Sequence, residues 1–388
     1  MKSFEYHNPT RIIFGENILS SLGKETAKLG SRGLLIYGKN SIHSSGVYDR
    51  VCQSLKSAGV TIIIEHPGVK ANPTLEHTRE GIQKVRHHKL DVVVAVGGGS
   101  VIDEAKAIAA GSLYEQDVWD FYCGKAVPQA ALPVVTVCTL PATASEMNCG
   151  TVITNESTQQ KFGVLSPLLY PKVSFLDPSL TFTLPREQIV YGTVDALSHL
   201  MEGYFTQKGG WTPIQDRFAE GLMKSLMEAL DRILKNPTDL DARATQMWGC
   251  TWAWNGFSAT GIGSFGLPNH ALGHALGGIY DLAHGATLSI VIPGWCRYEA
   301  KSRCERLALF AKNVFDLKNS SEQSVAMAGV AKLEAWYLAV GAPTRMSEAG
   351  INSPDISLLT QKAYELATLW GMPELTKDII SEIYNDVK

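Results

Sequence analysis

The sequence predicts two domains of different fold class, an α/β domain over residues 1–184 and an all-α domain over residues 185–388. Three observations predict this division. The first half alternates short strand-like runs with amphipathic helical patterns, LDPSLTFTLP (176–185) ends that alternation, and the second half has almost no strand-like run. A chain of 388 residues, 45% of them apolar and 19% charged, is long enough for two hydrophobic cores.

Four runs in the first half are predicted to form one parallel sheet. Most of them are nearly continuous apolar runs, as expected for strands that are buried on both faces. The runs are GLLIYG (33–38), VTIIIEH (60–66), DVVVAVGGGS (91–100) and PVVTVCT (133–139). Between them, residues 46–58 and 73–88 show amphipathic helical patterns, so helices are expected to cover the sheet.

The second half is predicted to be helical. Long helix-like patterns include QDRFAEGLMKSLMEALDRILK (215–235) and SEQSVAMAGVAKLEAWYLAV (321–340). At the other end of the chain, EYHNPTRIIFG (5–15) is strand-like and could pair between two subunits.

Charge and cysteine content exclude several classes of partner. A net charge of −3 gives no reason to expect nucleic acid or an anionic membrane as a partner. No run approaches the roughly 18 apolar residues that span a bilayer, and the N-terminus lacks the pattern of a secretory signal. The seven cysteines are scattered and form no CxxC pair, so a disulfide framework is not expected and the predicted location is the cytoplasm.

A glycine turn follows the third predicted strand and opens a helix. Gly97, Gly98 and Gly99 allow the backbone to approach a ligand closely, and Ser100 can cap the helix, whose N-terminus suits a phosphate. A tight connection with no ligand would have the same pattern. Asp103 and Lys106, three residues apart, could be a surface pair or could face the ligand.

Two further segments are expected at the same edge of the sheet. TLPATASEMN (139–148) and YGKNS (37–41) each follow a predicted strand, and ligands of open parallel sheets bind beyond the carboxyl ends of the strands. A dinucleotide is the simplest ligand that would use several of these loops together.

The second half concentrates residues that can bind a metal ion. VDALSHLMEGYF places Asp195 and His199 four residues apart, on one face of a helix. NHALGHALGGIYDLAHG repeats this spacing with His270 and His274, and His284 follows ten residues later. One such pair is more often a helix-stabilising hydrogen bond, but two pairs and a further histidine indicate a site for Fe²⁺ or Zn²⁺. Spacing alone does not decide which four of the five residues are ligands.

Together these motifs resemble the iron-containing alcohol dehydrogenase family, and within it the NADP-dependent butanol dehydrogenase-like branch. The resemblance covers essentially the whole chain, from NPTRIIFGENIL through GGGSVIDEAKAIA and TLPATASEMN to HALGHALGGIYDLAHG. It implies an N-terminal dinucleotide-binding domain and a helical C-terminal domain, the dehydroquinate synthase-like architecture, with the active site in the cleft between them.

The resemblance also implies roles for individual residues. The family's metal ligands fall on Asp195, His199, His270 and His284, which leaves His274 near the substrate as the candidate for proton transfer. The family's cofactor-binding positions fall on Gly97, Gly98, Gly99, Ser100, Asp103, Thr139, Thr143 and, as a weaker match, Lys161.

The sequence departs from the family pattern in two loops. NAD-dependent members often have an acidic residue after the first strong strand, where this chain has Gly38, Lys39, Asn40 and Ser41. Because a carboxylate would repel a 2′-phosphate and Lys39 would attract one, these residues are predicted to bind NADP(H) in preference to NAD(H). In the threonine loop, Ala144 stands where the family commonly has glycine.

The resemblance implies a cytoplasmic, homodimeric alcohol dehydrogenase or aldehyde reductase that acts on small aldehydes such as butanal and on primary alcohols. Two alternatives are a polyol (glycerol or propanediol) dehydrogenase and a non-redox enzyme like dehydroquinate synthase. The second needs a strongly cationic pocket for a phosphorylated substrate, whereas Ala, Leu, Gly and Phe surround the predicted ligands.

Overall fold

The computed structural model describes residues 1–318 and 321–388, which form two compact units. The α/β unit comprises His7–Pro185 and Asn236–Asn255, and the helical unit comprises Met1–Tyr6, Arg186–Lys235 and Gly256–Lys388. Two segments therefore depart from the division predicted from the sequence. The first six residues belong to the helical unit because the Lys2 N–H donates to the Gly261 carbonyl oxygen and the Tyr6 ring packs edge-on against Phe257.

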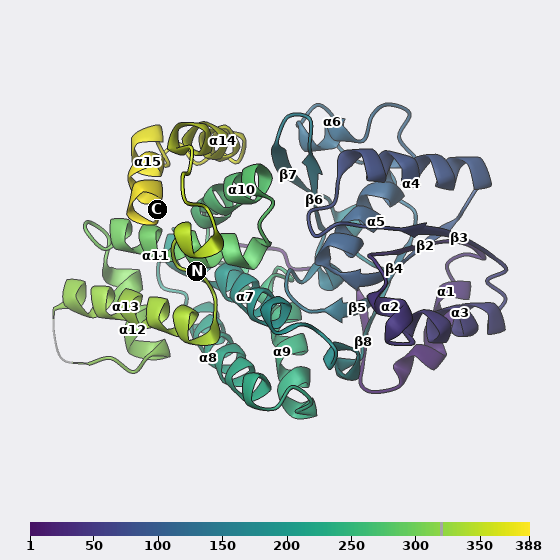
Figure 1. Ribbon diagram of the computed structural model, residues 1–388, viewed down its shortest axis with the longest axis horizontal. Helices are drawn as coiled ribbons and strands as arrows, with labels where there is room; N and C mark the ends of the chain where they lie inside the picture. Colours follow the sequence, from purple (N-terminus) through teal and green to yellow (C-terminus); the bar gives the residue numbers. More distant parts are fainter. Residues whose placement is uncertain (319–320) are drawn as a thin grey trace. The chain divides into compact units, whose positions relative to one another are not determined.

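A six-stranded parallel sheet forms the centre of the α/β unit (Figure 1) and confirms the predicted fold class. The strand order is β1-β8-β5-β4-β2-β3. The strands are β1 (Arg11–Phe14), β2 (Arg32–Tyr37), β3 (Ile62–Pro67), β4 (Val92–Gly98), β5 (Val134–Leu140) and β8 (Val173–Leu176). The strand-like N-terminal segment forms β1, which pairs with β8 of the same chain. One edge of β1 is therefore already paired within the chain.

Helices cover both faces of this sheet (Figure 1). They are α1 (Leu22–Ala27), α2 (Ser41–Ser44), α3 (Val47–Ser57), α4 (Leu75–His88) and α5 (Gly99–Gly111), while the short helix α6 (Trp119–Tyr122) contacts the antiparallel hairpin described below. On one face, Leu22, Val51 and Leu55 of α1 and α3 pack against Val94 and Val135 of the strands. Helices α4 and α5 pack against each other, and α5 lies against β4 and β5. Burial of these strands on both faces explains their continuous apolar runs.

A two-stranded antiparallel hairpin also belongs to the α/β unit. It consists of β6 (Gly150–Asn155) and β7 (Gln160–Leu165). This hairpin was not predicted from the sequence, because neither strand is a continuous apolar run like those of the central sheet.

Helix α9 (Leu240–Ala253) lies in the second half of the sequence but packs in the α/β unit. Asp239 caps its N-terminus by accepting a hydrogen bond from the Ala242 N–H. The buried Met247 side chain packs against Cys138 of β5 and Leu176 of β8. This apolar contact is the physical reason why residues 236–255 do not join the helical unit.

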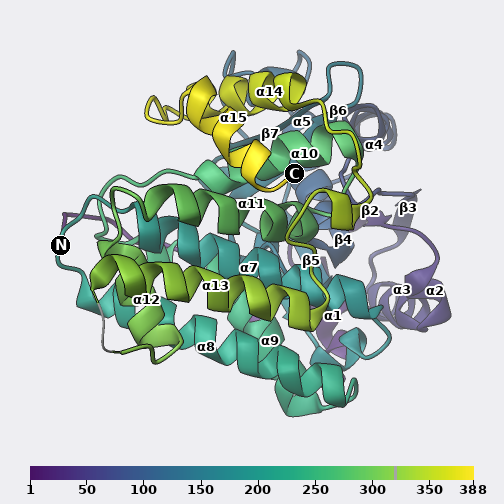
Figure 2. The same cartoon turned by 60° about the vertical axis from the view of Figure 1, so that its left-hand side comes forward.

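The helical unit consists of helices that surround α7 (Arg186–Thr206). The others are α8 (Pro213–Lys235), α10 (Pro268–Tyr280), α11 (His284–Glu299), α12 (Glu305–Val314), α13 (Glu322–Val340), α14 (Ile356–Leu369) and α15 (Lys377–Asp386). Helix α7 contacts α8, α10, α11 and α12, while α14 packs on α10 and α15 (Figure 2). Sixteen of the residues of α7 are buried, which makes it the central helix of this unit.

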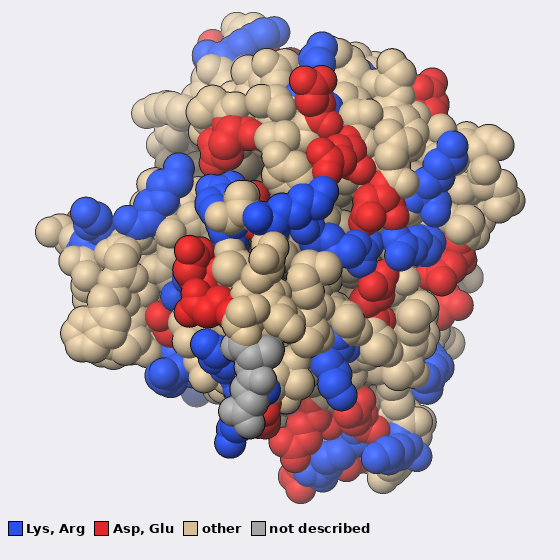
Figure 3. Space-filling view, turned by 90° about the vertical axis from the view of Figure 1, so that its left-hand side faces the viewer, with Lys and Arg blue, Asp and Glu red and all other residues tan. Residues whose placement is uncertain are grey.

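The surface of the helical unit carries charges of both signs. On the face shown in Figure 3, Lys and Arg side chains form a row that Asp and Glu side chains flank. Ion pairs such as Lys301–Glu382 and Arg297–Asp386 join residues of opposite charge in this unit. In the part of the chain that the structure describes, no helix has the length and apolar character needed to cross a bilayer.

Candidate functional site

The five residues predicted to lie near a metal ion come together in the helical unit. Asp195 and His199 lie on α7, His270 and His274 on α10, and His284 at the start of α11. Potential ligand atoms of Asp195, His199 and His270 all lie within 4.8 Å of one another, and all three residues are buried. A carboxylate and imidazoles gathered in this way are the donors that Fe²⁺ and Zn²⁺ accept.

Asp195 is the central residue of this group. Its Oδ1 atom lies 3.6 Å from His199 Nδ1 and 3.6 Å from His284 Nε2. These distances exceed those of ordinary hydrogen bonds, but they are close to the separation of about 3.4 Å between two ligands of one tetrahedral ion. Burial lowers the pKa of His199 well below its ordinary value, which keeps the imidazole in the neutral form that binds metals. The residues present therefore fit a divalent metal ion.

Helix packing sets the distance between Asp195 and His284. Gly285, the residue after His284, lies against the backbone of α7 one turn before Asp195. A Cβ atom on Gly285 would be 2.1 Å from the Tyr191 carbonyl oxygen and 2.6 Å from the Tyr191 Cα atom. Only glycine allows the two helices to approach so closely at this point.

Glu202 is the second buried acidic residue of this site, after Asp195, and it was not predicted from the sequence. One of its oxygens accepts a hydrogen bond from the His270 backbone N–H at 2.9 Å and lies 3.1 Å from His270 Nδ1, while the other accepts one from Asn269. Burial raises the pKa of Glu202 to about 8. A carboxyl oxygen that accepts from Nδ1–H leaves His270 Nε2 as the nitrogen for a metal, a common arrangement behind metal-binding histidines. The only signal in the sequence was its position three residues after His199.

His274 lies at the edge of the group. Its ring centroid is 6.2 Å from that of His270 and 5.1 Å from that of His284. The ring packs edge-on against Trp370 of the segment after α14, at 5.5 Å. The structure thus separates His274 from the three residues with mutually close ligand atoms.

The glycine turn and the two other predicted loops lie at neighbouring strand ends in the α/β unit. β4 pairs with β2 on one side and β5 on the other, so the segments after Tyr37, Gly98 and Leu140 share one edge of the sheet. After β2 the chain forms β3, which pairs with one edge of β2, and then β4, which pairs with the other edge. The point between β2 and β4 is therefore a topological switch point, where open sheets of this type bind ligands.

The glycine turn and the threonine loop touch directly. A Cβ atom on Gly99 would be 2.2 Å from Thr143 Oγ1, so a side chain at Gly99 would displace the loop. Thr139 lies at the end of β5, and the Ser100 hydroxyl donates to the Ala71 carbonyl oxygen. Ala144 in the threonine loop has a φ angle of +53°, a conformation that glycine adopts with less strain. This explains why glycine is favoured at that position.

Asp103 and Lys106 bind the threonine loop to α5 and do not form a surface pair. Asp103 accepts hydrogen bonds from the Ser145 hydroxyl at 2.5 Å and the Val152 N–H at 2.9 Å. The Lys106 ammonium, fully buried, lies within 3.0 Å of four acceptors on Ser145, Asn148 and Gly150. Burial raises the pKa of Asp103 and lowers that of Lys106 to about 8.

The other predicted cofactor residues differ in exposure. Gly38 to Ser41 follow β2, and Lys39, Asn40 and Ser41 are exposed. Lys161 on β7 is buried and donates a hydrogen bond to Asn72 Oδ1 at 3.0 Å. The loop before α4 is thus joined to the hairpin.

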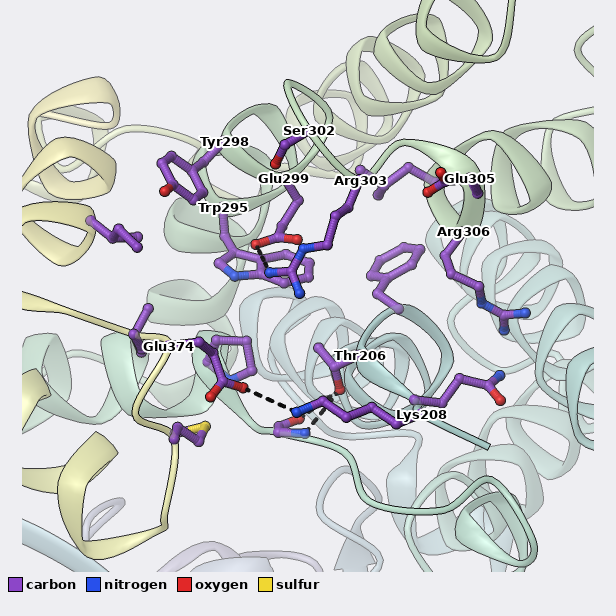
Figure 4. Close-up of a pocket in the computed structure, with 18 residues that line it drawn as sticks. Thr206, Lys208, Trp295, Tyr298, Glu299, Ser302, Arg303, Glu305, Arg306 and Glu374 are labelled. Carbon is purple, nitrogen blue, oxygen red and sulfur yellow. Dashed lines mark hydrogen bonds and ion pairs between the residues drawn. The ribbon is translucent and has the colours of Figure 1, made fainter. Parts of the chain in front are cut away.

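A pocket of about 260 Å³ in the helical unit lies near the start of α10 (Figure 4). Its lining combines Trp295 and Phe205 with ion-paired side chains, including Glu299–Arg303 at 2.8 Å and Lys208–Glu374 at 3.9 Å. In the described part of the chain, its lining includes none of the five residues around Asp195. This charged pocket is therefore distinct from the metal-binding group.

Family models match both halves of the chain. The model described as iron-containing alcohol dehydrogenase matches residues 9–178, and the model described as Fe-containing alcohol dehydrogenase family, C-terminal, matches residues 189–387. The chain belongs to the iron-containing alcohol dehydrogenase family. This confirms the resemblance inferred from the motifs, and it favours the oxidoreductase over the enzyme like dehydroquinate synthase.

Individual relatives match over nearly the full length. Probable NADH-dependent butanol dehydrogenase 1 of Bacillus subtilis is 38% identical, with 99% of each chain covered. NADPH-dependent aldehyde reductase YqhD of Escherichia coli is 35% identical, again with 99% of each chain covered. The crystal structure of NADH-dependent butanol dehydrogenase A from Thermotoga maritima gives a TM-score of 0.95 at 39% identity, covering 100% of this chain and 99% of that one. This class of alcohol dehydrogenase uses a nicotinamide cofactor and a metal ion.

Proposed function

We propose that this protein interconverts short-chain aldehydes and primary alcohols with NADPH as the preferred cofactor and Fe²⁺ or Zn²⁺ as the metal. The observation that carries the proposal is the position of Asp195 Oδ1 between imidazole nitrogens of His199 and His284, with His270 beside them. Relatives named as butanol dehydrogenases and as an aldehyde reductase support the choice of substrate class.

Asp195, His199, His270 and His284 would hold the metal ion in this proposal. A divalent ion held there supplies a Lewis acid that stabilises negative charge on the substrate oxygen. The Glu202 carboxylate orients His270 through its contact with Nδ1. Burial of Asp195, His199 and His270 excludes water from this side of the site.

His274 is proposed to give a proton to the alkoxide that forms when an aldehyde accepts hydride. An imidazole titrates near neutral pH and can both donate and accept a proton. The Trp370 ring holds the His274 ring in place, and the ring lies 5.1 Å from that of His284. The alkoxide would thus form close to the His274 ring, which donates the proton.

The glycine turn and the loops beside it are proposed to bind the dinucleotide, which supplies the hydride. Gly97 to Ser100 would contact the phosphates, with Thr139 and Thr143 on one side and Gly38 to Ser41 on the other. Asp103 and Lys106 would act through the threonine loop, since both bind Ser145. Lys161 would act through Asn72 in the same way.

Preference for NADPH rests on the exposed side chains after β2. Lys39, Asn40 and Ser41 present an ammonium, an amide and a hydroxyl group, and no carboxylate occurs between Gly38 and Ser45 to repel a 2′-phosphate. The names of the relatives include both NADH- and NADPH-dependent enzymes, so the preference has to be measured on this chain.

Replacing Lys39 with alanine is expected to lower kcat/KM for NADPH about tenfold, because one hydrogen bond from a charged group to phosphate is lost. The value for NADH should remain unchanged, since NADH lacks the 2′-phosphate. Steady-state kinetics with both cofactors measure the effect, with Lys56→Ala as the control for removing an exposed lysine of the same unit. An equal loss with both cofactors would show that Lys39 does not bind the 2′-phosphate.

The proposal as a whole is tested by oxidation of NADPH and NADH with butanal. The protein is purified without oxygen, stripped of metal, refilled with Fe²⁺ or Zn²⁺ and assayed. Turnover that requires metal and favours NADPH supports the proposal, whereas more efficient use of NADH overturns the cofactor preference. Full metal loading without turnover with either cofactor would overturn the proposed substrate class.

We also propose a homodimer in the cytoplasm. Trp211 is 83% exposed and lies beside Met1, and Phe4 in the same unit is 55% exposed, so an apolar surface is available for a second copy. The seven cysteines are free thiols, as suits a reducing compartment. Sedimentation equilibrium that gave the mass of one chain would exclude the dimer.

A further inference from the structure

A second group of metal-binding side chains lies in the α/β unit, apart from the residues discussed above. It consists of His66 on β3, His77 in the first turn of α4 and Glu104 on α5. Glu104 Oε1 lies 2.5 Å from His77 Nδ1 and 3.3 Å from His66 Nε2. Three different elements, β3, α4 and α5, thus bring one carboxylate and two imidazoles together.

Burial makes this carboxylate unusual. Glu104 and His66 are 0% and 1% exposed, while the His77 side chain is 22% exposed and provides contact with solvent. Among the described residues, no hydrogen-bond partner lies near the second carboxylate oxygen, Glu104 Oε2. A buried carboxylate oxygen without a partner is costly, and a bound cation would remove this cost.

We propose that His66, His77 and Glu104 form a second divalent metal site, which binds Zn²⁺. Zinc accepts this donor set with a water molecule as fourth ligand, and the partly exposed His77 side chain lies on the side of the group that faces solvent. The separation of 3.3 Å between His66 Nε2 and Glu104 Oε1 matches that of two ligands on one tetrahedral ion. Zinc would replace two contacts that the structure shows, those of His66 Nε2 with the His77 carbonyl oxygen at 3.0 Å and of His77 Nδ1 with Glu104 Oε1 at 2.5 Å.

The surroundings of His77 support this site. Its Nε2 atom lies 3.0 Å from the Pro67 carbonyl oxygen, so a proton on Nε2 can donate there, and Nδ1, which now contacts Glu104 Oε1, is the nitrogen that would bind zinc. A backbone carbonyl behind a ligating histidine is a common arrangement at zinc sites. The rings of His66 and His77 are stacked at 3.9 Å, and zinc binding requires the more exposed ring of His77 to turn out of the stack.

Lys84 competes with zinc for this site. Its ammonium lies 3.2 Å from His66 Nδ1 and donates to the Glu65 carbonyl oxygen at 2.9 Å. When His66 Nε2 binds zinc, Nδ1 carries the proton and faces another donor, so Lys84 has to move away. A glutamine at position 84 could instead accept a hydrogen bond from Nδ1, which predicts that Lys84→Gln binds zinc more tightly.

The test counts zinc ions bound to the full chain. Metal-free wild type, Glu104→Gln and His77→Ala are dialysed against the same buffered Zn²⁺ concentration, and zinc per chain is measured by elemental analysis. We expect each variant to bind one zinc ion fewer per chain than the wild type. Zinc affinity at this site should fall by more than the 10–100-fold that follows when a residue hydrogen-bonded to a metal ligand is removed. The group around Asp195 is identical in all three proteins, so its zinc content cancels in the comparison.

Two further variants complete the experiment. His87→Ala removes an exposed histidine from the same helix and should retain the wild-type zinc content. Because His77 is partly exposed, His77→Ala keeps the test valid should Glu104→Gln fail to fold. Equal zinc content in wild type and His77→Ala at every zinc concentration would overturn the proposal and leave a hydrogen-bonded His77–Glu104 pair.

Discussion

Replacing His270 with alanine is expected to remove most of the bound metal and to lower turnover about a thousandfold. In the described structure, Glu202 contacts His270 at two atoms, the backbone N–H and Nδ1. Among the described residues, it makes no such pair of contacts with the other three proposed ligands. Loss of a Lewis acid worth about 4 kcal/mol at the substrate oxygen corresponds to that factor in rate. Elemental analysis and single-turnover rates measure the two effects on the same preparation.

His274→Ala is the matched control for this prediction, since His274 lies one turn away on the same helix. We expect it to retain its metal and to lose about a hundredfold in turnover, as for removal of a general acid. Both variants remove one buried imidazole, so a general loss of stability would affect them alike. Equal metal content in the two variants would contradict the assignment of His270 as a ligand and of His274 as the proton donor.

Replacing Gly285 with alanine is expected to release the metal although the substitution changes no ligand. The new Cβ atom would meet the Tyr191 backbone at 2.1 Å, and a helix backbone cannot yield as a side chain can. Helices α7 and α11 must then separate, which moves His284 away from Asp195. We expect the free energy of unfolding to fall by about 1–3 kcal/mol, together with a loss of metal content.

Gly221 on α8 provides the control for Gly285→Ala. A Cβ atom there would meet no other atom within 4 Å, so Gly221→Ala should be neutral or should stabilise the chain by about 0.5–1 kcal/mol. Thermal unfolding of the two variants, each with and without metal, separates packing strain from loss of the ion. A Gly285→Ala protein with wild-type metal content would show that the distance between Asp195 and His284 does not depend on this helix contact.

Much of the sheet could be predicted from the sequence because a parallel strand buried on both faces leaves a continuous apolar run. The runs at residues 33–38, 60–66, 91–100 and 133–139 correspond to β2, β3, β4 and β5. The hairpin of β6 and β7 leaves no such signal. Helix α9 could be recognised as helical, but an amphipathic pattern does not tell which core its apolar face enters.

The candidate site shows a similar limit. Three histidines stand out in a segment of Ala, Leu and Gly, and Asp195 and the four histidines do come together. Glu202 could not be recognised, and the burial of Lys106 could not be predicted, because glutamate and lysine on a helix are usually exposed. Their burial depends on partners from distant segments, Asn269 for Glu202 and Asn148 for Lys106. The roles of all these residues in catalysis and cofactor binding stay predictions.

The position of α9 also affects the order in which the protein can fold during synthesis. Met247 covers Cys138 and Leu176, so the α/β unit lacks part of its buried surface until Asn255 has left the ribosome. By then α7 and α8 of the other unit have already been made. Neither unit can therefore be completed before the other has begun, and a gene truncated after Pro185 would yield a sheet with an exposed apolar patch that is prone to aggregate.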